Sequence, residues 1–466
     1  MRDTPQRKIL ILVWPEVSAY HATLRLSRVL TERGDQVVYA VPARWQDFIK
    51  RQGFETMLVE DVEGRSLWQN QAGWLKSLLT SQETAWQQLE ALNASLVWIK
   101  SGGFTLVLLY VTLWHFALAL HHLGIPYVAV NACLGGPENV EIPPIFSSQN
   151  PGPGRALQNR LAWLRLRFLG AFNHRHWGIL PSNPLARQAR LQDIGFAARH
   201  FFRTIAEPLR MPVYYRLLHT ARENGARIGW GDYGYRLVEP ELVLGPRSID
   251  YPWVKQTPYR LYAGACMDTQ RVEDAFDWSR VDEHRPVVYC AIGSHGSYWN
   301  QANRLRLVKA AIVACQAHPE WQLLLQLPGH DDLTTLGALP GNVMTAAWFP
   351  QIQALERADL VISHGGFGTL REALFYGVPL VVFPLGVDQP GNAARVVYHR
   401  VGLAGDIRTV TAEGLRKMIE TVMRDPSFRK HASQMSQYLQ ADNDCAGAVA
   451  FLDAFIGRHP RQQPVD

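Results

Sequence analysis

The sequence contains little that would crosslink the chain or send it out of the cell. Its five cysteines are odd in number, widely scattered and without a close paired spacing, which favours core thiols in a reducing compartment over disulfides or a zinc site. The apolar stretch near the N-terminus is too short for a signal peptide and is interrupted by Pro15 and Glu16. We therefore expect a cytoplasmic protein.

The chain also lacks any long block of one charge. The net charge is +6, and no run of Lys and Arg is long enough for a nucleic-acid tail. An apolar content of 47% with 19% charged residues is ordinary for a soluble globular protein, and 466 residues exceed what one core usually serves. The composition predicts two domains and no nucleic-acid partner.

Residues 101–137 contain no Asp, Glu, Lys or Arg, which raises the question of a transmembrane helix. Three histidines lie within this stretch, and the sequence LGIP breaks it before a strand-like YVAVN. These features favour a buried strand, helix and strand.

Strand and helix patterns alternate along both halves. Residues 8–14 form a short apolar run, residues 22–34 repeat apolar positions at helical spacing, and residues 36–41 form a second run. Similar runs at residues 286–294 and 321–327 open the second half. This alternation predicts α/β domains with doubly wound parallel sheets. His21 is expected in the loop after the first strand, at the sheet edge where such folds bind ligands.

The stretch from Trp348 to Gln389 carries the most specific pattern. The strand-like residues 361–364 lead into Gly365, Gly366 and Gly368, and a helical pattern follows. Free backbone N–H groups and a helix dipole at such a turn suit phosphates. His364 could add a hydrogen bond, and Thr369 could cap the helix or donate its hydroxyl. Glu372, one turn later on the same face, suits a ribose diol.

The order of these groups is more specific than the glycine turn alone. WxPQ, HxGxxTxxE, GVPxxxxP and DQ together resemble the donor-binding segment of family 1 glycosyltransferases, the UDP-glycosyltransferase group. HGGFGT in place of HCGWNS is similar to bacterial members that act on carotenoids, macrolides and rhamnolipids. The resemblance implies the GT-B fold, in which two facing Rossmann-like domains enclose the active site. It is sharp at residues 340–392 and around His21, and loose at residues 130–260.

The resemblance also implies roles for individual residues. Trp348 would stack on the uracil, Gln351 would contact the ribose or uracil region, and Glu372 would hold the ribose hydroxyls. His364, Gly365, Gly366, Gly368 and Thr369 would hold the diphosphate, with Ser294 a further candidate. Asp388 and Gln389 would contact the sugar, which suggests UDP-glucose or a near relative.

His21 is expected to be the general base that takes the proton of the acceptor hydroxyl, because imidazole titrates near neutrality. Two departures accompany it. The chain reads YHATL where members commonly show GHxxP, and residues 96–131 hold no Asp or Glu to orient the base. Ser101, Thr105, Thr112 or His115 could replace that partner, or the acceptor could be acidic enough to need less help.

The reaction implied is direct displacement with inversion, without a metal or other cofactor. The string Asp442-Asn443-Asp444 resembles a manganese motif of another glycosyltransferase fold, but it precedes a helix, where such residues are ordinary caps. Two alternatives remain open. One is an accessory protein that binds UDP-sugar without turnover, and the other is a UDP-sugar epimerase.

The first half is rich in tryptophan, with 11 of the 15 in the chain at or before Trp253. Such surfaces suit a lipophilic hydroxylated acceptor. Residues 155–177 mix Arg with Trp, Leu and Phe, which favours a helix packed on the domain, with peripheral contact to an anionic membrane as the alternative. We expect an acceptor domain at residues 1–265, a donor domain at 266–440, and a C-terminal helix at 441–466 that returns to the first domain.

Overall fold

The computed structural model describes most of the chain. The described residues are 7–59, 96–149, 154–170, 221–223, 225–232, 234–254, 256–293, 301–327 and 336–458.

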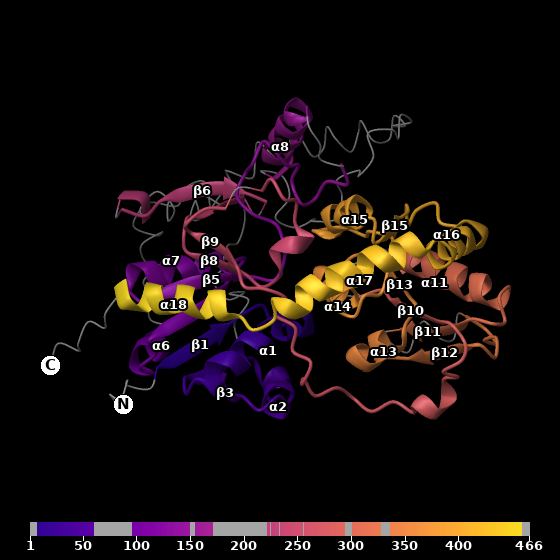
Figure 1. Ribbon diagram of the computed structural model, residues 1–466. Coiled ribbons are helices and arrows are strands. Elements are labelled where there is room, and N and C mark those ends of the chain that lie inside the picture. Colours follow the sequence, from indigo (N-terminus) through magenta and orange to yellow (C-terminus); the bar gives the residue numbers. More distant parts are fainter. Residues whose placement is uncertain are drawn as a thin grey trace, which may run out of the picture.

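The first domain is built on a seven-stranded parallel sheet with the order β3-β2-β1-β4-β5-β8-β9 (Figure 1). Its strands are short and mostly buried, as continuous apolar runs predict for parallel sheets. They are β1 (Lys8–Leu12), β2 (Gln36–Val41), β3 (Glu55–Leu58), β4 (Leu106–Tyr110), β5 (Tyr127–Asn131), β8 (Glu241–Val243) and β9 (Arg260–Tyr262).

The helices of this domain follow its strands, and a small antiparallel hairpin lies apart from the sheet. The helices are α1 (Val17–Glu32), α2 (Ala43–Arg51), α6 (Val97–Ser101), α7 (Trp114–His122) and α8 (Ala156–Gly170). The hairpin pairs β6 (Ile228–Gly231) with β7 (Gly234–Leu237). The uncharged stretch 101–137 thus forms β4, α7 and β5, as expected. Within the described residues no helix is both long and apolar enough to cross a bilayer.

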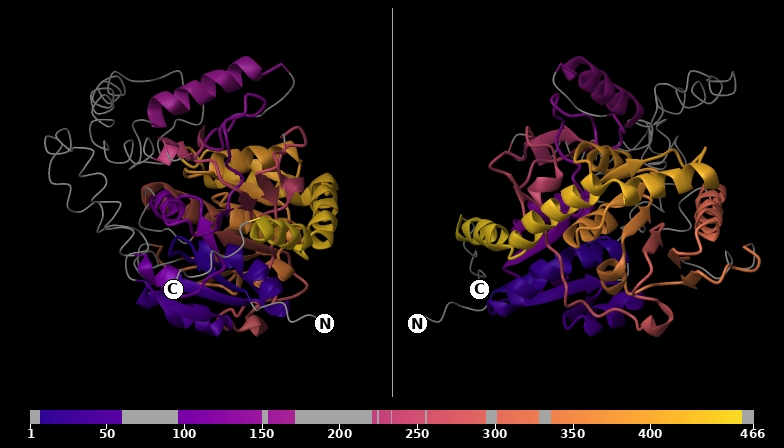
Figure 2. Two further views of the ribbon diagram at one scale, coloured as in Figure 1. Left: turned by 90° about the vertical axis from the view of Figure 1, so that its left-hand side faces the viewer. Right: turned by 45° about the vertical axis from the view of Figure 1, so that its right-hand side comes forward.

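Helix α8 only partly matches its prediction. Trp163 is buried, and its Nε1 donates to the carbonyls of Asn139 and Ile142 at 2.9 and 2.8 Å. The helix therefore packs on its own domain through this side chain. Leu157, Leu161 and Leu164 nevertheless remain more than half exposed, and Figure 2 shows α8 standing away from the two sheets.

The second domain has a six-stranded parallel sheet with the order β12-β11-β10-β13-β14-β15. This is the strand order of a Rossmann-like domain, whose ligands bind where the winding direction changes, between β10 and β13. The strands are β10 (Val287–Ala291), β11 (Gln322–Gln326), β12 (Val343–Ala346), β13 (Leu360–Ser363), β14 (Leu380–Val382) and β15 (Gly402–Ala404). The helices are α11 (Gln301–Gln316), α13 (Gln351–Arg357), α14 (Phe367–Phe375), α15 (Gln389–Tyr398) and α16 (Ala412–Arg424).

Two C-terminal helices connect the domains. Helix α17 (Pro426–Ala441) packs on α14 of the second domain, and α18 (Ala446–Arg458) packs beside β9 of the first (Figure 1). Asp453 on α18 accepts hydrogen bonds from Arg7 and Arg33 at 2.6 and 3.1 Å. Helix α18 therefore returns to the first domain.

The domains also meet through buried polar contacts. On α15, Arg395 donates to Asp250 of the first domain at 2.6 Å, and Tyr262 donates to the same carboxylate at 2.5 Å. On α14, Arg371 donates to the carbonyl of Leu244 at 2.6 Å. One core cluster includes residues of both domains, so the two domains pack directly against each other.

Candidate active site

The glycine turn predicted to hold phosphates lies at the point where the second sheet changes winding direction. His364 follows β13, and Gly293 follows β10, the neighbouring strand. Gly365 adopts φ +86°, a conformation that glycine adopts without steric cost. Its carbonyl accepts a hydrogen bond from Asn392 at 2.9 Å. This bond ties the turn to α15.

The ring of His364 fills the space between two glycines. A Cβ added to Gly293 would lie 2.7 Å from this ring, and one added to Gly366 would lie 2.6 Å from its Nε2. Both distances are shorter than any side chain tolerates, so the two glycines are required by the buried imidazole. His364 lies beside the turn, as predicted.

The helix after the turn begins three residues earlier than a cap at Thr369 would require. Gly366 is the N-cap of α14, and Thr369 is the third helical residue, so Thr369 does not cap the helix. The backbone N–H groups of Phe367, Gly368 and Thr369 have no acceptor within the helix. A Cβ on Gly368 would meet nothing within 4 Å. The positive end of α14 is therefore sterically open at Gly368.

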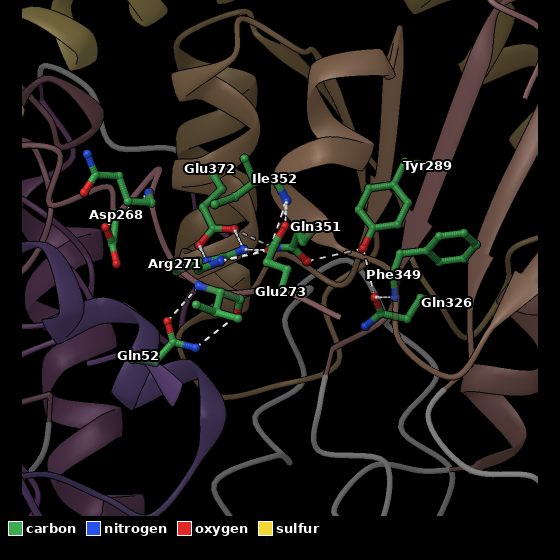
Figure 3. Close-up of polar contacts among 12 residues, drawn as sticks. Gln52, Asp268, Arg271, Glu273, Tyr289, Gln326, Phe349, Gln351, Ile352 and Glu372 are labelled. Atoms are coloured by element: carbon green, nitrogen blue, oxygen red, sulfur yellow. Dashed lines mark hydrogen bonds and ion pairs between the residues drawn. The ribbon is translucent and has the colours of Figure 1, made fainter. Parts of the chain in front are cut away.

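Glu372 is buried on α14 and is bound by a residue of the segment that links the two sheets. Arg271, in the segment between β9 and β10, donates to both of its carboxylate oxygens at 2.6 and 3.0 Å (Figure 3). Burial alone would raise the pKa of Glu372, but the charge and hydrogen bonds of Arg271 lower it to about 2. Glu372 is therefore ionised throughout the physiological range.

Gln351 lies between Glu372 on α14 and Tyr289 on β10 and contacts both. Its Nε2 donates to Glu372 Oε2 at 2.6 Å. Tyr289 on β10 donates to Gln326 at 2.9 Å, and its hydroxyl also lies 3.4 Å from Gln351 Oε1 (Figure 3). Half-buried Trp348 lies just before α13, in the same connection. The expected ribose and base contacts thus come together around α13 and α14.

Asp388 and Gln389 lie at the start of α15. Asp388 is buried and accepts hydrogen bonds from Asn392 at 2.8 Å and from the thiol of Cys133 in the first domain. Burial raises its pKa despite these bonds. Gln389 Oε1 accepts from the backbone of Leu385 and Gly386 at 2.8 and 3.1 Å. The side-chain amide oxygen of Gln389 thus stabilises the loop that precedes α15.

His21 faces this site from the first domain, but it lies on α1 and not in a loop. The carbonyl of Glu16 accepts the N–H groups of Ala19 and Tyr20, so the helix begins at Val17. Helix α1 lies against α14. Burial, with the nearby charge of Arg271, lowers the pKa of His21 to about 3, while Glu372 acts in the opposite direction. The ring is therefore neutral and able to take a proton, but its pKa lies far below the near-neutral value that the sequence predicted for a general base.

The residues considered as partners of His21 lie at different edges of the first sheet. Ser101 Oγ donates to the carbonyl of Trp98, and Thr105 lies before β4, at the sheet edge opposite to His21. Thr112 follows β4 at the correct edge, whereas the side chain of His115 lies outside the described residues. The carboxylate that acts on His21 is Glu372, from the other domain.

Two features of the sequence remain: the donor-binding candidate Ser294, and the Asp442-Asn443-Asp444 (DxD) string, which was expected to cap a helix. Ser294 lies outside the described residues. In the DxD string, Asp444 accepts the N–H of Ala446 at 2.9 Å, and Asn443 exchanges hydrogen bonds with the backbone of Met267. This segment therefore begins α18 and attaches it to the interdomain segment. Among the described residues, no cluster of three or more His, Cys, Asp or Glu side chains could hold a metal ion.

Comparison with known proteins agrees with this arrangement. Residues 320–452 match the family described as "Erythromycin biosynthesis protein CIII-like, C-terminal domain". The oleandomycin glycosyltransferase of Streptomyces antibioticus is 29% identical over 229 residues, which cover 48% of this chain and 51% of the relative. The demethyllactenocin mycarosyltransferase of Streptomyces fradiae is 31% identical over 220 residues, 47% of this chain and 45% of the relative.

Over about half of its length the chain is similar to these bacterial glycosyltransferases. Its fold is that of the glycotransferase of kitacinnamycin, with a TM-score of 0.67 at 22% identity over 97% of this chain and 100% of the other. This confirms the GT-B fold predicted for the family. The sequence match spans about half the length of the curated relatives.

Several residues of the site were not predicted from the sequence. The contact of Asn392 with Asp388 could have been predicted, because Asn392 lies one helical turn after Asp388 at the start of a helix. No local pattern predicted the other residues, because only the tertiary fold brings them to the site. They are Arg271, Glu273, Tyr289 and Gln326.

Proposed function

We propose that this protein transfers a hexose, with glucose as the first candidate, from a UDP-sugar to a hydroxyl of a lipophilic small molecule or lipid. The observation that carries the proposal is the open N-terminus of α14 at the winding change of one domain, with His21 of the other domain beside it. The relatives named for oleandomycin and demethyllactenocin support a natural product as the acceptor.

In the proposed reaction His21 takes the proton of the acceptor hydroxyl. The hydroxyl oxygen forms a bond to the anomeric carbon, and the bond from that carbon to the diphosphate breaks on the opposite face, which inverts the configuration. UDP leaves with the electron pair. The N–H groups of Phe367, Gly368 and Thr369 and the helix dipole stabilise its charge, so the proposal assigns no step to a metal.

Each remaining part of the nucleotide-sugar donor is assigned to residues already described. Trp348 would stack on the uracil, Gln351 would contact the base or ribose, and Glu372 would hold the ribose. His364 would add to the diphosphate contacts, and Ser294 remains a candidate there. Asp388 and Gln389 would contact the sugar, and their position beside Cys133 of the first domain supports a sugar held between the two domains.

The first test is UDP release with a panel of UDP-sugars and lipophilic alcohols, with and without a chelator, and NMR assignment of the product's anomeric configuration. Binding of UDP with neither transfer nor hydrolysis would support an accessory protein. Conversion of the sugar without an acceptor would support an epimerase.

We expect His21→Ala to lower the transfer rate by about 100-fold or more, because general bases contribute factors of about 10²–10⁴. His284→Ala, which changes an exposed histidine between the domains, is the matched control and should leave the rate unchanged. Near-full transfer by the His21 variant would remove His21 from the role of base without removing the proposed reaction.

A further inference from the structure

Helix α8 packs on the first domain along one side. The buried residues of this side are Asn159, Trp163 and Leu166. Asn159 Nδ2 donates to the carbonyl of Val140 at 3.1 Å, and Trp163 Nε1 donates to two further carbonyls of the same loop. These bonds fix the rotation of α8 about its own axis, so its other side chains have defined directions.

The opposite side of α8 carries a stripe of exposed leucines. Leu157, Leu161 and Leu164 are 69%, 57% and 57% exposed. Their intervals of four and three residues place them on one face. At 3.6 residues per turn, the centre of this stripe lies roughly 160° from the buried side. A surface helix needs one apolar stripe to pack on its domain, so the second stripe indicates another apolar environment.

Arginines flank this stripe on both sides. Arg160 and Arg165 are exposed, and helical geometry places each of them roughly 70° from the centre of the stripe, one to either side. The helix contains no Asp or Glu. An arginine side chain keeps its apolar stem on apolar surroundings while its guanidinium group binds phosphate. Leucines between two arginines therefore complement an anionic lipid surface, with acyl chains under the leucines and headgroups at the arginines.

The length of α8 determines how it could meet a bilayer. The helix has 15 residues, which rise about 22 Å and are too few to cross a hydrocarbon core of about 30 Å. Its buried side must also stay on the first domain. Helix α8 would therefore lie in the plane of the interface, with its leucines about 5–10 Å into the boundary of headgroups and acyl chains.

The loop that holds α8 also contacts the donor domain. The carbonyl of Ile145 accepts the backbone N–H of Gly391 on α15 at 2.8 Å. Cys133, at the start of the same connection from β5 to α8, donates its thiol to Asp388. One connection thus joins α8 to the residues proposed to hold the sugar. Figure 2 shows that α8 itself stands away from both sheets, where a flat surface could reach it.

We propose that α8 docks this protein on an anionic phospholipid bilayer. Leu157, Leu161 and Leu164 enter the bilayer, and Arg160 and Arg165 bind the lipid phosphates. The inference goes beyond the proposed function and does not depend on it, because bilayer binding needs neither donor nor acceptor. It also gives the proposed lipophilic acceptor a source, since such a molecule would dissolve in the bilayer on which the protein is docked.

The test is sedimentation with vesicles of phosphatidylcholine alone, or of phosphatidylcholine and phosphatidylglycerol in equal parts. We expect the mixed vesicles to bind at least about tenfold more tightly, and salt to weaken that binding. Changing Leu157, Leu161 and Leu164 together to Gln should lower the partition coefficient by about tenfold or more, because three apolar side chains lose their burial. Arg160→Gln with Arg165→Gln should lower binding to the mixed vesicles by about 10- to 30-fold.

The matched controls change similar side chains on the second domain. Val313→Gln with Tyr438→Gln removes two exposed apolar side chains, 49% and 67% exposed, from α11 and α17. Lys309→Gln with Lys430→Gln removes two exposed positive charges from the same two helices. Both control variants should bind mixed vesicles as the unchanged protein does.

Equal binding by the unchanged protein and the leucine variant would overturn the proposal, as would equal binding to neutral and mixed vesicles. Analytical ultracentrifugation without lipid tests whether a second copy covers the stripe. Self-association that is lost in the leucine variant would overturn the proposal in favour of a dimer. A melting temperature lowered far more by the leucine changes than by the apolar control would show that the stripe packs within the chain, and would also overturn it.

Discussion

His21 and Glu372 are side chains whose titration is set by what surrounds them. The pKa of His21 is lowered to about 3 by burial and Arg271, and that of Glu372 is lowered to about 2 by Arg271 against burial. Both groups therefore have one charge state throughout the range in which the protein would work. A neutral base and an ionised carboxylate face each other across the domain interface.

The lowered pKa of His21 predicts a pH-dependent stability. As the pH falls below 6.5, the unfolded chain protonates this histidine while the folded chain does not, so the folded state loses stability until the pH reaches about 3. Between pH 7 and 5 this loss is at most roughly 2 kcal/mol. Denaturant unfolding at both pH values should show a smaller loss for His21→Gln than for the unchanged protein. An identical loss in both would contradict the shift.

The sequence located the signature residues of the site but not the residues that bind them. His364, Glu372 and Asp388 could be predicted because their spacing follows one strand–turn–helix unit. Arg271 could not, because it is 101 residues from Glu372 and lies in a charged stretch that resembled a linker. Pairing of that kind depends on how two domains face each other, which no local pattern reports.

At the scale of elements, the start of α14 is the feature on which phosphate binding depends. Gly368 is the second residue of this helix, and a Cβ there would meet nothing within 4 Å. Gly368→Ala should therefore leave folding stability unchanged, or raise it by about 0.5–1 kcal/mol through helix propensity. The added methyl group should nevertheless lower UDP affinity by about tenfold, because a bound phosphate needs the same space.

Gly447→Ala provides the matched control. Gly447 is the second residue of α18, its Cβ would also meet open space, and it lies outside the site. This variant should have a similar effect on thermal stability and no effect on UDP affinity in calorimetry. Unchanged UDP binding by the Gly368 variant would remove the phosphate from the start of α14.

Most elements could be predicted, because continuous apolar runs and helical spacing are local properties. The strand pattern at residues 36–41 matches β2, and α18 lies within the C-terminal segment, residues 441–466, that was predicted to be helical. The start of α1 could not be predicted, because Pro15 and Glu16 resemble a loop. The helix begins there through a backbone carbonyl and not through a capping side chain. That difference moved His21 from a loop onto a helix.

At the scale of the whole molecule, the buried pair of Arg395 and Asp250 joins the two domains. Their side chains are 4% and 1% exposed. Arg395→Met should destabilise the protein by about 3–5 kcal/mol, because it leaves a buried carboxylate without its partner. The double variant that also carries Asp250→Leu should recover much of this loss. Chemical denaturation measures both.

The exposed pair of Arg429 and Asp359, 42% and 43% exposed, is the control. Arg429→Met should cost no more than about 1 kcal/mol, as is usual for surface ion pairs. A loss of similar size at Arg395 would show that the interface pair adds nothing beyond a surface contact.

The path of α18 has a consequence for synthesis of the chain. This helix covers part of the N-terminal domain, and Arg7 and Arg33 bind its Asp453. A nascent chain emerging from the ribosome would expose that surface until α18 is made. The first domain is therefore completed only after the second has been synthesised, and we expect loss of residues 446–458 to harm the half of the protein made first.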